Sequence, residues 1–396
     1  MNSLSPRRFA TLFFLLPWTL LAVGIVFSAL FPAVALRSGL GVLLVSALVF
    51  GMPHGACDLW AMQRAMRRRW SRNESPSSTR CDVSTRARKL FDVKWCAAYI
   101  AVALAMLMLW RINAPLALGV FLFITVWHFG SADAWLHRVS SDFATADSAS
   151  PSASPSATST RAHLPKVARC CLSWGRGLLV IGAPLALQPA ATHEILRHFA
   201  ALSAPAFDIS SWWRFALPLL LLGIVLQGVG QFLSVWPRRS SARTSGNRTS
   251  STRCRNWTRW DSALWIESVL LLALFAVVPP LLAVACYFLA LHSWRHLLRL
   301  QLFSEDDSAS QKPRDNASLD NRDSTWLWAT RAVVRQHAQS LLPTLATFLG
   351  LIPILVWWPA LLHDALQWNV AYLVLVSAVT LPNMMVIAWL ESQHNL

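Results

Sequence analysis

Four of the eleven histidines lie where long apolar segments approach their ends. They are His54 in GMPHGACDLW, His128 in WHFGSADAW, and His292 and His296 in LHSWRH. Because His292 and His296 are four residues apart, a helix would place both imidazoles on one face, where they can bind the same ion. Imidazole suits iron, copper, nickel and zinc, whereas magnesium and calcium prefer oxygen ligands. The pattern therefore predicts a site for a redox-capable metal or for zinc.

Two acidic residues follow these histidines closely in the sequence. Asp58 comes four residues after His54, and Asp133 comes five residues after His128. A carboxylate often accepts the ring N–H that a metal-bound histidine does not use for the metal, and this contact fixes the orientation of the ring. Asp58 and Asp133 are therefore predicted to orient the histidines.

Other residues near the same depth are candidates to contact this site. Glu267 lies near the start of the seventh predicted apolar segment, and Tyr287 lies within the eighth. An acid at such a position also serves as a helix cap or an interface residue, and this alternative remains open for Glu267. Gly51, Gly55 and Gly130 flank the histidines, where a small residue lets two helices approach closely.

The segments that carry these residues are too apolar for a soluble protein. Of 396 residues, 55% are hydrophobic and 14% are charged, and the apolar residues come in long runs. The hydrocarbon layer of a bilayer, about 30 Å thick, needs roughly 20 apolar residues per helix, and open strands cannot satisfy their backbone groups there. We therefore predict an all-α fold, a single integral membrane domain over residues 1–396 that forms a polytopic transmembrane helical bundle of about ten spans. The spans are expected at residues 9–31, 40–62, 95–110, 115–135, 170–187, 215–236, 263–278, 281–300, 341–358 and 370–390.

The distribution of basic residues predicts which side of the membrane each loop faces. The formal net charge is +16, and Lys and Arg gather at the N-terminus and in the loops at residues 64–94, 138–176, 238–259 and 295–335. By the positive-inside rule, these loops and both termini are predicted to be cytoplasmic, in a multi-pass protein of the cell membrane. Attraction to anionic headgroups of the lipid bilayer accounts for the charge, so no nucleic-acid partner is expected. This topology places the four histidines at a similar depth, near the cytoplasmic face.

Three segments change sharply from apolar to Ser- and Arg-rich or otherwise polar composition, at residues 140–161, 238–252 and 304–324. Such a composition cannot bury enough apolar surface to offset the entropy that the chain loses on ordering. These segments are therefore predicted to be disordered cytoplasmic linkers between spans.

Histidines within a membrane bundle are typical of two classes of protein. In a multi-span transporter or channel they form a metal or proton pathway. In an enzyme they hold a catalytic metal at one depth. The similar depth predicted for the four histidines favours the enzyme, and the transporter or channel remains the alternative.

Three short elements surround the four histidines. They read Pro-His-Gly-Ala-Cys-Asp at residues 53–58, His-Phe-Gly-Ser-Ala-Asp at residues 128–133 and His-Ser-Trp-Arg-His at residues 292–296. With these elements the sequence resembles the Brp/Blh family of membrane β-carotene 15,15′-dioxygenases. The resemblance extends from the second predicted span to the tenth.

The resemblance implies an oxidoreductase that cleaves β-carotene at its central 15,15′ double bond with O₂ and forms two molecules of all-trans-retinal. It also implies Fe²⁺ as the cofactor, held by His54, His128, His292 and His296. β-Carotene and O₂ are then the substrates, and so hydrophobic a molecule as β-carotene is expected to enter from the lipid bilayer. Nothing in the sequence indicates the oligomeric state.

One family element departs from the pattern in the last predicted span. Family members tend to have Pro-His-Met there, whereas this chain has Pro-Asn-Met at residues 382–384. Asn383 is therefore a candidate contact to substrate or site. If the family histidine contacts substrate or metal, the asparagine implies altered specificity or reduced activity.

Overall fold

The computed structural model of the chain describes residues 6–51, 62, 81–146, 166–203, 209–244, 250–309, 325–359 and 365–393. Throughout these residues the regular structure is helical and no strand occurs, which confirms the predicted all-α class. The predicted site residues His54 and Asp58 lie outside the described residues.

The helices follow one another along the chain, and some contain π-helical turns. In a π-helix the backbone hydrogen bonds reach five residues back instead of four, and such turns are often found at functional sites. Within the described residues the π-helical turns are η1, η2 and η4. The elements are α1 (Pro6–Ala10), η1 (Thr11–Leu15), α2 (Leu16–Leu30), α3 (Pro32–Ser46), η2 (Ala47–Gly51), α5 (Cys81–Ile112), α6 (Ala114–Ala146), α7 (Lys166–Leu187), α8 (Pro189–Ala200), the 3₁₀ turn η3 (Ile209–Trp212), α9 (Trp213–Thr244), α10 (Ser250–Val277), α11 (Pro280–Tyr287), η4 (Phe288–Ser293), α12 (Trp294–Ala309), α13 (Thr325–Phe348), α14 (Leu351–Trp357) and α15 (Ala365–Gln393).

Eight helical segments among the described residues are long and apolar enough to cross a membrane. They are residues 8–30, 32–51, 93–112, 114–133, 166–187, 213–234, 280–302 and 370–389. Residues 327–342 and 344–357 meet the same criterion as a pair bent by 52°, and residues 263–277 of α10 form a shorter apolar helix. The eight long segments confirm a polytopic helical bundle, while the bent pair and the shorter helix lie over the predicted spans 341–358 and 263–278. The side of the membrane on which the termini lie stays a prediction.

The second span begins earlier than the predicted range of residues 40–62. Helix α3 starts at Pro32, directly after Phe31, and the apolar segment runs to Gly51. Proline is favoured in the first turn of a helix because it has no N–H to satisfy there and its fixed φ suits the helix. Arg37 lies inside α3, and the single residue Phe31 separates this helix from α2.

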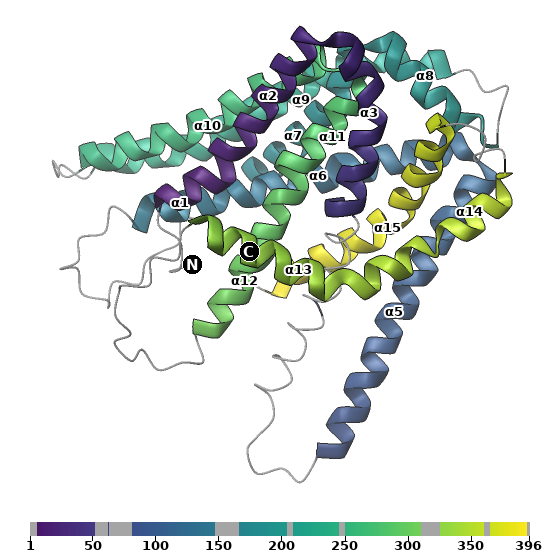
Figure 1. The fold of residues 1–396 in the computed structure, drawn as a ribbon. Coiled ribbons are helices and arrows are strands. Elements are labelled where there is room, and N and C mark those ends of the chain that lie inside the picture. The colour runs from purple at the N-terminus through teal and green to yellow at the C-terminus, as the bar shows by residue number, and fades with distance from the viewer. Residues whose placement is uncertain are drawn as a thin grey trace.

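Helix α7 lies at the centre of the packing and contacts α6, α9 and α10. Further contacts join α3 to α11, α5 to α15 and α2 to α10, and Figure 1 shows the lower end of α5 reaching past the rest of the bundle. Helix α6 also contacts α10, while η4 contacts α2 and η2. The helix that carries His128 and the turn that carries His292 are thus both supported from several sides.

Helices α6 and α7 touch through their backbones at glycines. A Cβ atom added to Gly130 would lie 1.7 Å from the carbonyl oxygen of Ser173, and one added to Gly177 would lie 1.8 Å from that of Val126. No side chain fits at such a distance, so only glycine permits this crossing. Gly130 follows His128 by two residues. The expected close helix approach at Gly130 is confirmed, and it fixes the segment that carries His128.

Helices continue into the edges of all three predicted linkers. The ends concerned are Ala146 of α6, Thr244 of α9, Ser250 of α10 and Ala309 of α12. The linkers are therefore shorter than residues 140–161, 238–252 and 304–324, because a helix that has already formed gains one hydrogen bond for each residue by which it is extended. What remains of each linker lies outside the described residues, and its disorder stays a prediction.

Candidate functional site

His292 lies in the π-helical turn η4, and His296 lies one turn later in α12. The π-helical turn adds one residue to the local repeat and changes the direction of the side chains that follow. Both histidine side chains are buried, with 4% of His292 and 3% of His296 exposed. The structure therefore places these two predicted ligands on one continuous helical rod inside the protein.

His128 of α6 lies beside His292. The ring centroids are 4.8 Å apart and the ring planes are inclined by 66°, and His128 is only 8% exposed. A ligating nitrogen about 2.1 Å from a metal puts the centroid of its ring about 3.2 Å from that metal, so two neighbouring ligands have centroids roughly 4.5–5.2 Å apart. The observed separation falls in this range. The ring separation of His128 and His292 is therefore short enough for two imidazoles that share one ion.

One of the four predicted ligands, His54, lies outside the part of the chain that the structure describes. In that part, no group of three or more His, Cys, Asp or Glu side chains is placed to hold one metal ion. Of the other predicted ligands, the structure brings the rings of His128 and His292 into contact and places His296 one turn after His292. Coordination by all four histidines therefore stays a prediction.

Aromatic rings surround the side chain of His292. Its ring centroid lies 4.6 Å from that of Phe129, 5.5 Å from that of Phe288 and 6.5 Å from that of Tyr287. A Cβ atom on Gly51 would lie 2.7 Å from the Phe288 ring, so η2 packs directly behind that ring. The predicted candidate Tyr287 thus lies near His292, and the surroundings of the histidine pair are apolar and tightly packed.

Four buried charged residues form a closed set of ion pairs next to this region. Arg176 donates to Asp133 Oδ2 at 2.7 Å and also pairs with Glu267. Arg295 donates to Asp133 Oδ1 at 3.2 Å and to Glu267 Oε1 at 2.9 Å. Each arginine therefore contacts both carboxylates, and each carboxylate contacts both arginines. We call these four residues the charge ring.

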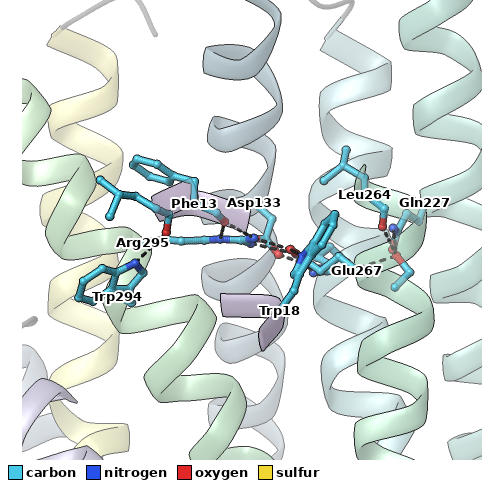
Figure 2. Close-up of polar contacts among 11 residues, drawn as sticks. Phe13, Trp18, Asp133, Gln227, Leu264, Glu267, Trp294 and Arg295 are labelled. Atoms are coloured by element: carbon cyan, nitrogen blue, oxygen red, sulfur yellow. Dashed lines mark hydrogen bonds and ion pairs between the residues drawn. The ribbon is translucent and has the colours of Figure 1, made fainter. Parts of the chain in front are cut away.

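The charge ring is held by further hydrogen bonds from neighbouring helices. Figure 2 shows Arg295 reaching between the backbone of Phe13 and the carboxylates of Asp133 and Glu267. The indole of Trp18 donates to Glu267 Oε2 at 2.8 Å, and Arg295 donates to the carbonyl of Phe13 at 2.8 Å. On the other side, Arg176 donates to the hydroxyl of Ser268 at 3.2 Å. All four members are at most 8% exposed.

Two members of the charge ring were predicted to take part in the site, and two were missed. Asp133 and Glu267 bind arginines, and whether either also acts on a metal-bound histidine stays a prediction. Arg176 and Arg295 had been assigned to basic cytoplasmic loops. That assignment is wrong for both, because their side chains are 3% and 5% exposed within helices. The sequence feature that could have pointed to these arginines was the presence of two acids at span ends, since a buried carboxylate needs a cationic partner.

Asn383 on α15 is buried and bound to a neighbouring helix. The hydroxyl of Tyr99 on α5 donates to Asn383 Oδ1 at 2.7 Å, and Asn383 is 6% exposed. This contact joins α5 and α15, which pack against each other. The departure from the family histidine thus falls at a helix-to-helix hydrogen bond.

Comparison with known proteins identifies relatives of the chain. The profile of the family described as beta-carotene 15,15′-dioxygenase matches residues 45–391. The chain is 26% identical over 362 residues to the probable beta-carotene 15,15′-dioxygenase Blh of Halobacterium salinarum, an alignment that covers 88% of this chain and 83% of the relative. No solved structure matches the chain.

Proposed function

The chain belongs to the β-carotene 15,15′-dioxygenase family, and from this premise we propose that it cleaves β-carotene at the central 15,15′ double bond with O₂, in a reaction that depends on iron. The observation that carries the proposal is the buried pair of His128 and His292, which come from two separate family elements and lie 4.8 Å apart. Each carbon of the cleaved double bond receives one oxygen atom, so one O₂ accounts for both molecules of all-trans-retinal.

In the proposed reaction, His128 and His292 would hold ferrous iron together with His54 and His296. Bound iron would supply the redox chemistry that activates O₂. The protein need not supply an acid, a base or a nucleophile, because neither substrate carries a charge or a proton that must be transferred. The rings of Phe129 and Phe288 beside His292 provide apolar surroundings, which suit a substrate as apolar as β-carotene.

We expect the chain to convert β-carotene to retinal when it is expressed in bacterial cells that accumulate β-carotene. The cells should lose their colour, and extracts should contain retinal by chromatography. The matched control is the His128→Ala variant, which keeps the chain and removes one of the two adjacent imidazoles. Cells in which colour persists and retinal is absent, although the wild-type chain is present in the membrane, would refute the proposed activity.

Asn383→His is expected to change turnover only modestly, within roughly tenfold, or about 1.4 kcal/mol of barrier. An imidazole nitrogen can accept the hydrogen bond that Tyr99 donates to Asn383, so the link between α5 and α15 can persist. The measurement is the rate of retinal formation by the purified wild-type and variant proteins. If the wild-type chain makes no retinal while Asn383→His does, position 383 belongs to the essential site.

A further inference from the structure

We propose that the charge ring of Asp133, Arg176, Glu267 and Arg295 is a positioning device that aligns the histidine-bearing helices α6 and α12. The inference rests on the proposed function, because it concerns the same histidines. The members of the charge ring act through the helices that they join and are not themselves ligands.

The first step is the placement of the ring members along the two histidine-bearing helices. Arg295 lies between His292 and His296 in the sequence, and Asp133 follows His128 by five residues. With a rise of 1.5 Å per residue, Arg295 stands about 4.5 Å along the helix axis from His292. The ion pair between Arg295 and Asp133 therefore connects α6 and α12 close to the level of the histidines.

The second step is the geometry of the arginine contacts. A guanidinium group is planar and donates in a fixed fork, so its partners determine its orientation as well as its position. Arg295 donates from Nη1 to Asp133 and Glu267, from Nε and Nη2 to the carbonyl of Phe13, and from Nη2 also to Glu267 Oε2. A rotation or a shift of α12 would break contacts to three different segments at once.

The third step concerns the π-helical turn η1 in the first span. A π-helical turn displaces the ordinary backbone hydrogen bonds, and side-chain donors can satisfy the carbonyls so displaced. The indole of Trp294 donates to the carbonyl of Leu12 at 2.9 Å, and Arg295 donates twice to the carbonyl of Phe13, at 2.8 and 3.0 Å. Two consecutive residues between His292 and His296 thus fix α12 against η1.

The charge ring has no remaining charge with which to bind an ion. It contains two guanidinium groups and two carboxylates, so its formal charge is zero, and each charged group is already paired. Buried charges in a membrane bundle are costly unless they are paired. A closed neutral set is therefore suited to fixing helices relative to one another, and a set of this kind offers no pathway for ions.

The test uses the full-length protein in detergent, freed of metal, with Co²⁺ alone as the probe. The double variant Arg295→Met with Glu267→Gln removes one positive and one negative charge, so the pair of Asp133 and Arg176 remains neutral. We expect the dissociation constant for Co²⁺ to rise at least tenfold and the Co²⁺ absorption spectrum to change, because the histidines lose their alignment. Wild-type affinity and an unchanged spectrum would overturn the proposal.

The matched control is Glu194→Gln with Arg197→Met on α8, which also removes one charge of each sign. This pair is exposed, its atoms lie 2.8 Å apart, and the hydrogen bond from Arg197 lowers the pKa of Glu194. Co²⁺ binding by this control should equal that of the wild-type protein.

The second test variant, Arg295→Lys, keeps the charge and loses the fork, and it covers the case in which the double variant does not fold. We expect the Lys variant to bind Co²⁺ about three- to tenfold more weakly while its thermal unfolding stays within a few degrees of wild type. Wild-type affinity in the Lys variant would contradict the proposal. If the wild-type protein itself binds neither Co²⁺ nor Fe²⁺, the iron dependence proposed above fails, and the positioning role fails with it.

Discussion

Replacing His292 and His296 together by alanine is expected to abolish metal binding and retinal formation. The change removes two of the four imidazoles that the proposed site uses, and one of them lies 4.8 Å from the ring of His128. Loss of a residue that merely supports a ligand already weakens metal binding 10- to 100-fold, so loss of two ligands should exceed a hundredfold, or about 2.7 kcal/mol. Elemental analysis of the purified protein should show iron absent.

The control for this experiment replaces two histidines elsewhere. His193 and His198 lie on α8, where His193 packs against Trp213 and His198 contacts the backbone of Glu194. The variant His193→Ala with His198→Ala should keep wild-type iron content and activity. Iron at wild-type occupancy in His292→Ala with His296→Ala would exclude this pair as ligands.

Gly130→Ala is expected to be the most destabilising single substitution considered for this protein. The added methyl group would lie 1.7 Å from the carbonyl oxygen of Ser173, so α6 and α7 would have to move apart along their crossing. Forcing extra volume into a packed interior usually costs 1–3 kcal/mol, and a clash with backbone that cannot move aside should cost at least about 3 kcal/mol. The measurement is thermal unfolding in detergent, together with the yield of folded protein.

Gly41→Ala provides the matched comparison for Gly130→Ala. Gly41 also lies in a helix, α3, but nothing lies within 4 Å of a Cβ atom added there. Alanine is the better helix former by about 0.5–1 kcal/mol, so this variant should be as stable as wild type or slightly more so. Equal stability of the two variants would show that α6 and α7 can separate without cost.

The long apolar runs were enough to predict the bundle, because the requirement for about 20 apolar residues per span leaves few alternatives. The start of the second span was predicted at residue 40 and lies at Pro32, because proline is favoured in the first turn of a helix. The predicted boundary between residues 278 and 281 agrees with the junction of α10 and α11 at Pro279 and Pro280.

The histidines could be chosen from the sequence as candidate metal ligands, because their spacing and their positions within the apolar runs are local properties of the sequence. Local sequence could not predict the ion pairs of the charge ring, in which Arg176 and Arg295 bind Asp133 and Glu267. These ion pairs depend on how four helices distant in sequence are arranged, and the positive-inside rule assigns a basic residue near a span end to a loop by default. The π-helical turn at His292 was also not predictable, since no local composition distinguishes it from an ordinary helical turn.

The four residues of the charge ring are synthesised and inserted into the membrane in their order along the chain. Asp133 emerges first, then Arg176, then Glu267 and finally Arg295, so negative and positive charges alternate. An unpaired charge within a membrane-inserted helix is costly. The growing chain therefore carries one unpaired charge of the ring once Asp133 or Glu267 has been inserted. It carries none once the arginine that follows each of them has been inserted. Insertion of α7 thus makes the ring residues of α6 and α7 neutral as a pair, and insertion of α12 does the same for those of α10 and α12. Arg295 then also contacts Asp133, which links the second pair to the first.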